Sequence, residues 1–200
     1  MTRIWRYVLA HDNGMAPCTD GGLLSLCCCK PVIRRHAVEG DWVIGFVPKR
    51  FGFGKMGWAG KVQRIVSLGE YQRIHPARRD AIYKLADDGP PGENERLIPL
   101  RSDYHADGSS RRRDLRGRNA LLFDPFWYFG GYGVQAPPEV SELAHYYVGQ
   151  STKRSTPEAI AALRDWLASV GPAGVYGEPR EDVTLTAKPC GGCGGGQTGR

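Results

Sequence analysis

The stretch CCCKPVIRRHAVEGDWVIGF, residues 27–46, joins three adjacent cysteines to a basic segment and then to an apolar run. The β-branched and aromatic residues at 42–47 follow a Gly-Asp turn and predict a buried strand. Pro31 disfavours a helix through Lys30, so we interpret the basic segment as extended. Cations placed between thiols and a core strand point to a role beyond solubility.

Strands outnumber helices in the prediction for the rest of the first 150 residues. Apolar and aromatic runs predict strands at 4–10, 58–66, 120–123 and 145–149, a turn at Asp124-Pro125, and an aromatic segment at 126–129. Turn-forming residues predict loops at 13–25 and 86–95, and the polar, basic segment 101–119 is expected to be irregular. A short helix is expected at about 70–74. Gly57 and Gly60 indicate a bulge or a close backbone approach inside a strand.

The C-terminal part of the chain has a different pattern. Ser155 and Glu158 form an S-x-x-E capping box, and an apolar stripe follows, which together predict an amphipathic helix at 155–170. Beyond Pro179 the Gly-rich sequence can bury little, so 181–200 is expected to be disordered. We therefore predict a domain at 1–150, a helical extension at 151–180 and this tail.

Composition limits the function classes. The 200 residues carry a net charge of +6, which favours polyanionic partners such as DNA or nucleotides. No apolar run is long enough for a membrane span and no secretory signal precedes the first strand, so we expect a cytoplasmic protein with reduced thiols. Cys190 and Cys193 supply only half of a zinc site, and we predict neither a metal nor a cofactor.

Ordered motifs carry a resemblance to a known family. The motifs are YVLAHDNGMAP (7–17), CKPVIRR (29–35), GDW (40–42), DYH (103–105) and FWYFGG (126–131). Together they resemble the bacterial and phage family called nucleotide modification associated domain 2 over about residues 1–150. The resemblance implies a role around modified DNA bases, without an established reaction.

A second likeness concerns architecture. The Gly-Asp turn at 40–41 and the following GWAGKVQRIVS strand are similar to the PUA-like group, which includes EVE and ASCH domains. This likeness implies an α+β fold: a mainly antiparallel β-barrel with short flanking helices and the C-terminal amphipathic helix. Members of that group bind RNA or hold modified bases flipped out of a duplex.

Lys30, Arg34 and Arg35 are the predicted phosphate-binding residues. Their charge persists at neutral pH, and a guanidinium can hold two phosphate oxygens at once. In an extended segment, Lys30 and Arg34 share one side. The alternative is that one arginine pairs with Asp41 or Glu39 and the other is solvated.

Tyr7, Trp42 and Tyr128 are the predicted base-binding residues, because an unstacked base is held by aromatic rings and by hydrogen bonds to its edge. The alternative is that these rings belong to the core, as most aromatic residues of a small domain do. Phosphate and base contacts together predict a binding module for nucleic acid or nucleotides associated with base modification.

Asp12, Cys29 and His105 are the candidate catalytic residues of an alternative, enzymatic function on a modified base or nucleotide. Asp12 could serve as a general base, Cys29 as a thiol activated by nearby cations, and His105 as an acid or proton relay. Against this, Asp12 could cap a turn, and the cysteines could be small buried apolar residues.

Two further features bear on partners. The run SSRRRDLRGR, residues 109–118, places five arginines against one aspartate and could steer an anionic strand, or could be a solvated loop. The helix at 155–170 could bind a protein partner, which would make the chain an interaction subunit.

Overall fold

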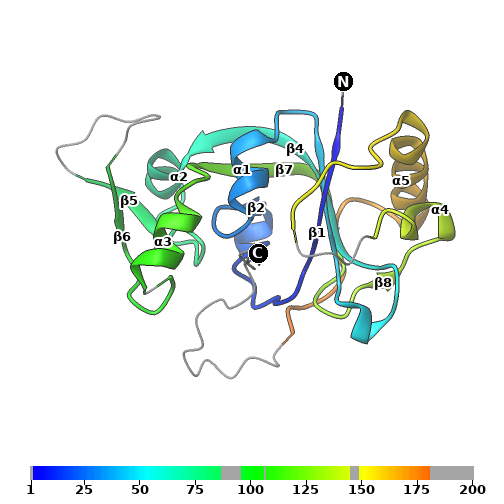
Figure 1. Cartoon of the computed structure of the whole chain (residues 1–200), viewed down its shortest axis with the longest axis horizontal. Coiled ribbons are helices and arrows are strands. Elements are labelled where there is room, and N and C mark those ends of the chain that lie inside the picture. The colour runs from blue at the N-terminus through cyan, green and yellow to red at the C-terminus, as the bar shows by residue number, and fades with distance from the viewer. Residues whose placement is uncertain (1, 87–95, 106, 145–148, 181–200) are drawn as a thin grey trace, which may run out of the picture.

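A seven-stranded mixed sheet forms the centre of the protein (Figure 1). The computed structural model describes residues 2–86, 96–105, 107–144 and 149–180. The strands of the sheet follow the order β1 (Ile4–Val8), β3 (Trp42–Phe46), β4 (Lys55–Ser67), β7 (Asn119–Tyr128) and β2 (Leu24–Leu26). Two short strands extend it, since β8 (Val134–Gln135) pairs with β4 and β9 (Gly174–Val175) pairs with β7. A separate hairpin contains β5 (Tyr83–Leu85) and β6 (Leu97–Pro99).

Helices lie on both faces of this sheet. They are α1 (Pro31–His36), α2 (Leu68–Ile74), α3 (Gly108–Asp114), α4 (Pro138–Ser141) and α5 (Pro157–Val170), with 3₁₀ turns at Asp20–Gly22 and Lys49–Phe51. Helices α4 and α5 lie at one end of the molecule as drawn in Figure 1, α2 and α3 lie toward the other end, and α1 lies between them near the middle. None of the helices formed by the described residues is long and apolar enough to cross a bilayer.

The sheet does not close into a barrel, so the predicted PUA-like β-barrel is wrong. Strands β1 and β2 are at the two ends of the path, with β3, β4 and β7 between them. Strand β1 pairs with β3 in parallel, a connection that needs a crossover. The chain between β1 and β3 contains β2, which pairs with β7 at the other end of the path, and α1. Helices and antiparallel pairs together still fit the α+β class.

Strict alternation along β1 and β3 separates two cores. Ile4, Trp42 and Ile44 face the core that α4 and α5 cover. Trp5 and Val43 face the other core, which also contains the three adjacent cysteines. This alternation is the consequence of the two-residue period of a strand. The cysteine-bearing face is the one that carries most of the predicted site.

Several predicted elements are confirmed. The predicted strands at 4–10 and 42–47 are β1 and β3, the strand at 58–66 lies within β4, and the helix at 70–74 lies within α2. Gly60 allows the close approach that its position in a strand indicated, because a Cβ there would lie 2.9 Å from the Cβ of Phe123. The β4–β7 register shifts directly after Gly60.

The basic segment after Cys29 is helical, which corrects the extended interpretation. Pro31 is the first residue of α1, where its missing N–H costs nothing. Lys30 caps the helix in the left-handed conformation. Pro31 therefore keeps Lys30 out of the helix, as expected, but the residues that follow form a helix and not the extended segment that was predicted.

Other elements differ from the prediction in detail. Residues 108–114 of the segment expected to be irregular form α3, capped by Asp107. Strand β7 continues through Asp124-Pro125 without the expected turn. Helix α5 is capped by Thr156 in place of the predicted Ser155 box. The expectations for residues 87–95, 145–148 and 181–200 lie outside the described residues.

The segment 151–180 contacts the same sheet as the rest of the chain. Leu163 and Leu167 of α5 are buried in the core that contains Trp42. Ser151 pairs with Arg6 at the outer edge of β1, and β9 pairs with β7. The predicted boundary at residue 150 thus falls between segments that share a core.

Candidate functional site

Tyr7, Asp12 and Tyr128 meet where β1 ends. The Tyr128 hydroxyl donates a hydrogen bond to Asp12 Oδ2 at 2.8 Å. The Tyr7 hydroxyl accepts one from Trp58 Nε1, also at 2.8 Å. The indole of Trp58 has room for this contact because Gly45 lies opposite it, where a Cβ would approach Nε1 to 2.5 Å. The sequence predicted a role for these three residues, and the fold brings them together.

Asp12 is a buried carboxylate, with 1% of its surface exposed. Burial raises its pKa, while the Tyr128 hydrogen bond, the Gly14 amide and the charge of Arg180 oppose that rise. Its Oδ2 has Tyr128 as a partner, but Oδ1 is buried and makes no hydrogen bond of ordinary geometry within the described residues. A buried acceptor without a partner is costly, and in a native protein it calls for an explanation such as a ligand.

Lys30 lies beside this group. Its Nζ is 4.6 Å from the centre of the Tyr7 ring, within the range of a cation–π contact. Burial raises the pKa of Tyr7 well above its ordinary value, and the nearby Asp12 and Cys29 raise it further. Tyr7 therefore stays a neutral phenol, and its ring makes the cation–π contact with the Lys30 ammonium group.

Cys29, His105 and Asp114 form a second group on the same side. Cys29 Sγ is 3.8 Å from His105 Nε2, and that nitrogen is 3.6 Å from Asp114 Oδ2. Burial lowers the pKa of His105, but the contacts with Cys29 and Asp114 outweigh it and the net shift is upward. The Tyr104 hydroxyl also lies 3.3 Å from Cys29 Sγ.

Arg34 holds Asp114 in place. Its guanidinium is fully buried and contacts Asp114 Oδ1 at 2.6 Å. Its remaining N–H groups donate to backbone carbonyls of Cys29, Asp114, Gly117 and Asn119. All five donors of the guanidinium are thereby used. Arg34 has no donor left for a phosphate, so its predicted phosphate role is not kept. Its partner is also neither Asp41 nor Glu39.

Neither Arg35 nor Trp42 joins Tyr7, Asp12 and Tyr128 in the buried group. Arg35 is exposed on α1, one residue from the buried Arg34. Trp42 is buried in the opposite core, with its ring 6.4 Å from that of Trp127. Trp42 is therefore a core residue, which was the alternative given for the predicted base-binding aromatic residues.

Strained backbone coincides with this site. Among the described residues other than glycine, positive φ occurs at Cys29 (58°), Lys30 (45°), His105 (50°) and Arg154 (71°). Cys29 and His105 belong to the second group described above, and Lys30 lies beside the first. Such conformations cost free energy in L-residues and persist where the surrounding structure holds them, as at functional sites.

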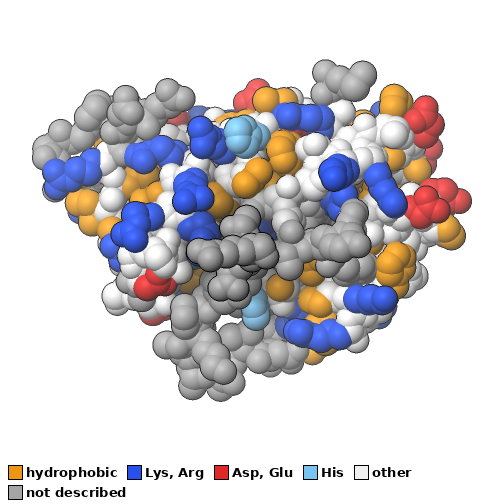
Figure 2. Space-filling view, viewed as in Figure 1, with side chains coloured by type: hydrophobic (Ala, Val, Ile, Leu, Met, Phe, Trp, Pro, Cys, Tyr) orange, Lys and Arg blue, Asp and Glu red, His pale blue; other side chains and the backbone are white. Residues whose placement is uncertain are grey.

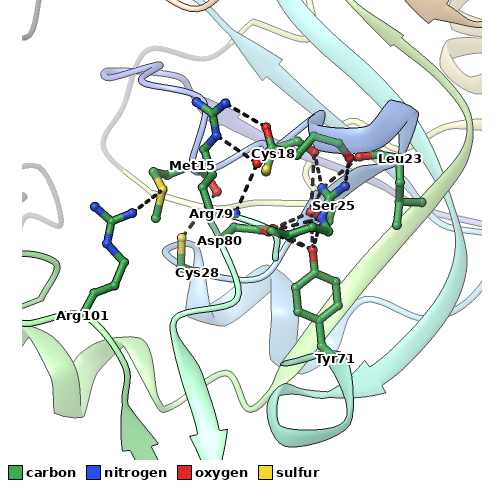
Figure 3. Close-up of polar contacts among 11 residues, drawn as sticks. Met15, Cys18, Leu23, Ser25, Cys28, Tyr71, Arg79, Asp80 and Arg101 are labelled. Carbon is green, nitrogen blue, oxygen red and sulfur yellow. Dashed lines mark hydrogen bonds and ion pairs between the residues drawn. The ribbon is translucent and has the colours of Figure 1, made fainter. Parts of the chain in front are cut away.

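Ser25, Tyr71, Arg78 and Asp80 form a separate buried polar cluster that sequence reasoning did not anticipate. Figure 3 labels Ser25, Tyr71 and Asp80 of this cluster. Ser25 Oγ donates to Asp80 at 2.5 Å and the Tyr71 hydroxyl donates at 2.9 Å. Arg78 donates to Tyr71 at 2.6 Å and to carbonyls of the loop 18–25. Because these groups satisfy one another, we interpret the cluster as structural.

Asp114 is the site residue that sequence reasoning missed. It stands within the arginine run and looks there like a solvated counterion. The only signal in the sequence was that Asp114 is the single acid between Asp107 and Arg118.

In the part of the chain that the structure describes, no three Cys, His, Asp or Glu side chains are grouped to hold a metal. Cys190 and Cys193 lie outside that part.

A family model described as nucleotide modification associated domain 2 matches residues 1–186. No curated protein and no solved structure matches the chain significantly. The matched region covers most of the chain, including both groups of site residues and α5. The family's name associates its members with nucleotide modification. The chain belongs to the nucleotide modification associated domain 2 family.

Proposed function

We propose that this domain binds a nucleotide unit, with Asp12 and Tyr128 hydrogen-bonding to the base and Lys30 contacting the phosphate. The observation that carries the proposal is the buried Oδ1 of Asp12, which makes no hydrogen bond of ordinary geometry within the described residues. A base edge offers the N–H donors that such an oxygen requires. The family's association with nucleotide modification agrees with a ligand of this kind.

The electrostatic arrangement supports the same ligand. Asp12 and Lys30 both lie close to Tyr7, so a hydrogen-bond acceptor and a cation are found near one aromatic ring. A nucleotide has the complementary pair of groups, because its base carries donors and its phosphate is anionic. Lys30 is only half-buried, so its ammonium group can approach a phosphate without full desolvation.

The test compares two isosteric variants by calorimetric titration with the four nucleoside monophosphates and with a single-stranded oligonucleotide. Asp12→Asn replaces an acceptor by a donor and should weaken binding by at least about tenfold, since hydrogen bonds to charged groups are worth roughly 1.5–3 kcal/mol. Asp124→Asn alters an exposed carboxylate on β7 and should leave the affinity unchanged. Equal affinities in the two variants would refute the proposal.

The contacts of Cys29 favour a second candidate, an enzyme in which this thiol attacks the base or nucleotide. His105 lies 3.8 Å from Cys29 Sγ and can take its proton. Asp114 would act as a positioning residue that stabilises the imidazolium, because Arg34 and the Tyr83 hydroxyl fix its carboxylate. The strained conformations at Cys29 and His105 agree with a site built for chemistry.

Alkylation tests this second candidate without knowledge of the substrate. Iodoacetamide reacts with a thiolate to form a thioether and release iodide, and peptide mass spectrometry locates the modified cysteine. His105→Gln should slow modification of Cys29, whereas His36→Gln, which alters an exposed histidine on α1, should not. A Cys29 rate that is the same in both variants would remove the argument for an activated thiol.

A further inference from the structure

Arg35, Arg112 and Arg116 form an exposed cationic surface, which we name the arginine face. Arg35 belongs to α1, Arg112 belongs to α3, and Arg116 follows α3 directly. Figure 2 shows Lys and Arg side chains gathered over α1 and α3, whereas the larger acidic patches of that view lie over α4 and α5. The sequence left open whether the arginine-rich run at 109–118 is a solvated loop. The structure shows that residues 109–114 of this run belong to α3.

The two helices that carry the arginine face are fixed relative to each other. The buried Arg34 of α1 donates to carbonyls at the end of α3 and beyond it, at Asp114 and Asn119. Gly117 packs against the first turn of α1 so closely that a Cβ there would lie 2.6 Å from Pro31 O. The exposed arginines are thus mounted on a rigid support instead of a mobile loop.

Nearby acids do not neutralise the arginine face. Asp114 is buried and paired with Arg34. Asp103 pairs with Arg101, and the carboxylate of Asp107 accepts the amides that begin α3. Within the described ranges, no ion pair joins an acid to Arg35, Arg112 or Arg116. Exposed cations without counterions attract a polyanion.

The face adjoins the proposed nucleotide site. Lys30 caps α1, and its Nζ lies over the Tyr7 ring beside Asp12. At the other helix, Asp114 at the end of α3 contacts His105, which contacts Cys29. A chain of phosphates that crosses α1 and α3 would therefore bring one of its nucleotides to Lys30.

We infer that the ligand is a polynucleotide strand whose sugar–phosphate backbone lies on Arg35, Arg112 and Arg116 while one base reaches the Asp12 site. The inference rests on the proposed function and specifies its substrate class. A mononucleotide carries its phosphate on one sugar and cannot contact Lys30, Arg35 on α1, and Arg112 and Arg116 on and after α3 at the same time. Backbone contacts of this kind position a strand without reading its sequence.

The experiment measures the salt dependence of affinity for a fluorescein-labelled single-stranded oligonucleotide, as DNA and as RNA of the same sequence. The variant R35A/R112A/R116A removes the arginine face. The matched control, K49A/K61A/R164A, removes three exposed cations that lie on neither helix. The slope of log K against log salt is negative, and each lost phosphate contact makes it less steep by about 0.7. The variant R35A/R112A/R116A should therefore make the slope less steep by about 2, and the control should leave it unchanged.

Mononucleotide titration separates this inference from the proposed function. The inference requires that R35A/R112A/R116A lose oligonucleotide affinity and keep most of the affinity for a nucleoside monophosphate. Equal slopes in the two triple variants would overturn it, because attraction would then depend on net charge alone. Mononucleotide binding by the wild type without oligonucleotide binding would overturn it and leave the proposed function standing. If neither the mononucleotide nor the oligonucleotide binds, both this inference and the proposed function fail. Affinity for only the DNA or only the RNA strand would identify the polymer.

Discussion

At the scale of single residues, Arg34 and Arg35 show what the sequence can and cannot reveal. Both belong to the same basic run and have the same chemistry, so nothing in the motif separates them. The fold buries Arg34 against Asp114, which is 80 residues away in the chain, and leaves Arg35 exposed. Asp12, Tyr7 and Tyr128 could be named as candidates from the sequence because their residue types suit a base, whereas Asp114 became a candidate only through its contacts.

This difference predicts unequal effects on stability. Arg34→Ala should lower the free energy of unfolding by roughly 3–5 kcal/mol, because it leaves the Asp114 carboxylate buried without its partner. Arg35→Ala should change it by less than about 0.5 kcal/mol. Urea denaturation of the two variants measures both values. Comparable losses would mean that the two arginines have equivalent environments.

His105 gives the stability of the domain a pH dependence. Its pKa is raised in the folded state, where Cys29 and Asp114 favour the charged ring against burial and the charge of Arg34. The stabilisation is therefore complete below the unfolded pKa of about 6.5 and is lost as the pH rises through the higher folded value. The free energy of unfolding of wild type minus that of His105→Gln should fall over this window. A difference that stays constant or grows with pH would contradict the prediction.

At the scale of elements, the strands were more predictable than the short helices. Strands β1, β3 and β4 follow from dense apolar and β-branched runs, which report burial on a sheet directly. Helices α1 and α3 each have fewer than eight residues, which is too short for an apolar stripe that a sequence pattern could reveal. Their stability comes from tertiary contacts such as those of Arg34. Helix α5 was predictable because its stripe is long and amphipathic.

Helix α5 should contribute to the stability of the whole domain. Leu163→Ala should lower the free energy of unfolding by about 2–5 kcal/mol, because the side chain is fully buried in the core beneath the sheet. Arg164→Ala, on the exposed side of the same helix, should change it by less than about 0.5 kcal/mol, since arginine and alanine have similar helix propensities. One cooperative denaturation transition is expected for both variants. A separate early transition in Leu163→Ala would indicate that 151–180 unfolds as an independent extension.

At the scale of the whole molecule, the sequence indicated the α+β class but not the closure of the sheet. The two-residue period shows which side chains share a face, and it says nothing about whether the first and last strands meet. The crossover between β1 and β3 carries α1 and the cysteine segment over one face, and α4 and α5 cover the other. This asymmetry places the Asp12 and Cys29 groups on one side of the sheet.

Ultraviolet crosslinking of a single-stranded oligonucleotide, followed by mass spectrometry of the crosslinked peptides, tests the central claim most directly. That claim is that nucleotides bind on the side of the sheet that carries Asp12 and Lys30, next to α1 and α3. The account predicts crosslinks within residues 7–17 or 101–105, where Tyr7 and Tyr104 lie beside these groups. Crosslinks confined to residues 138–170, on the side covered by α4 and α5, would contradict it.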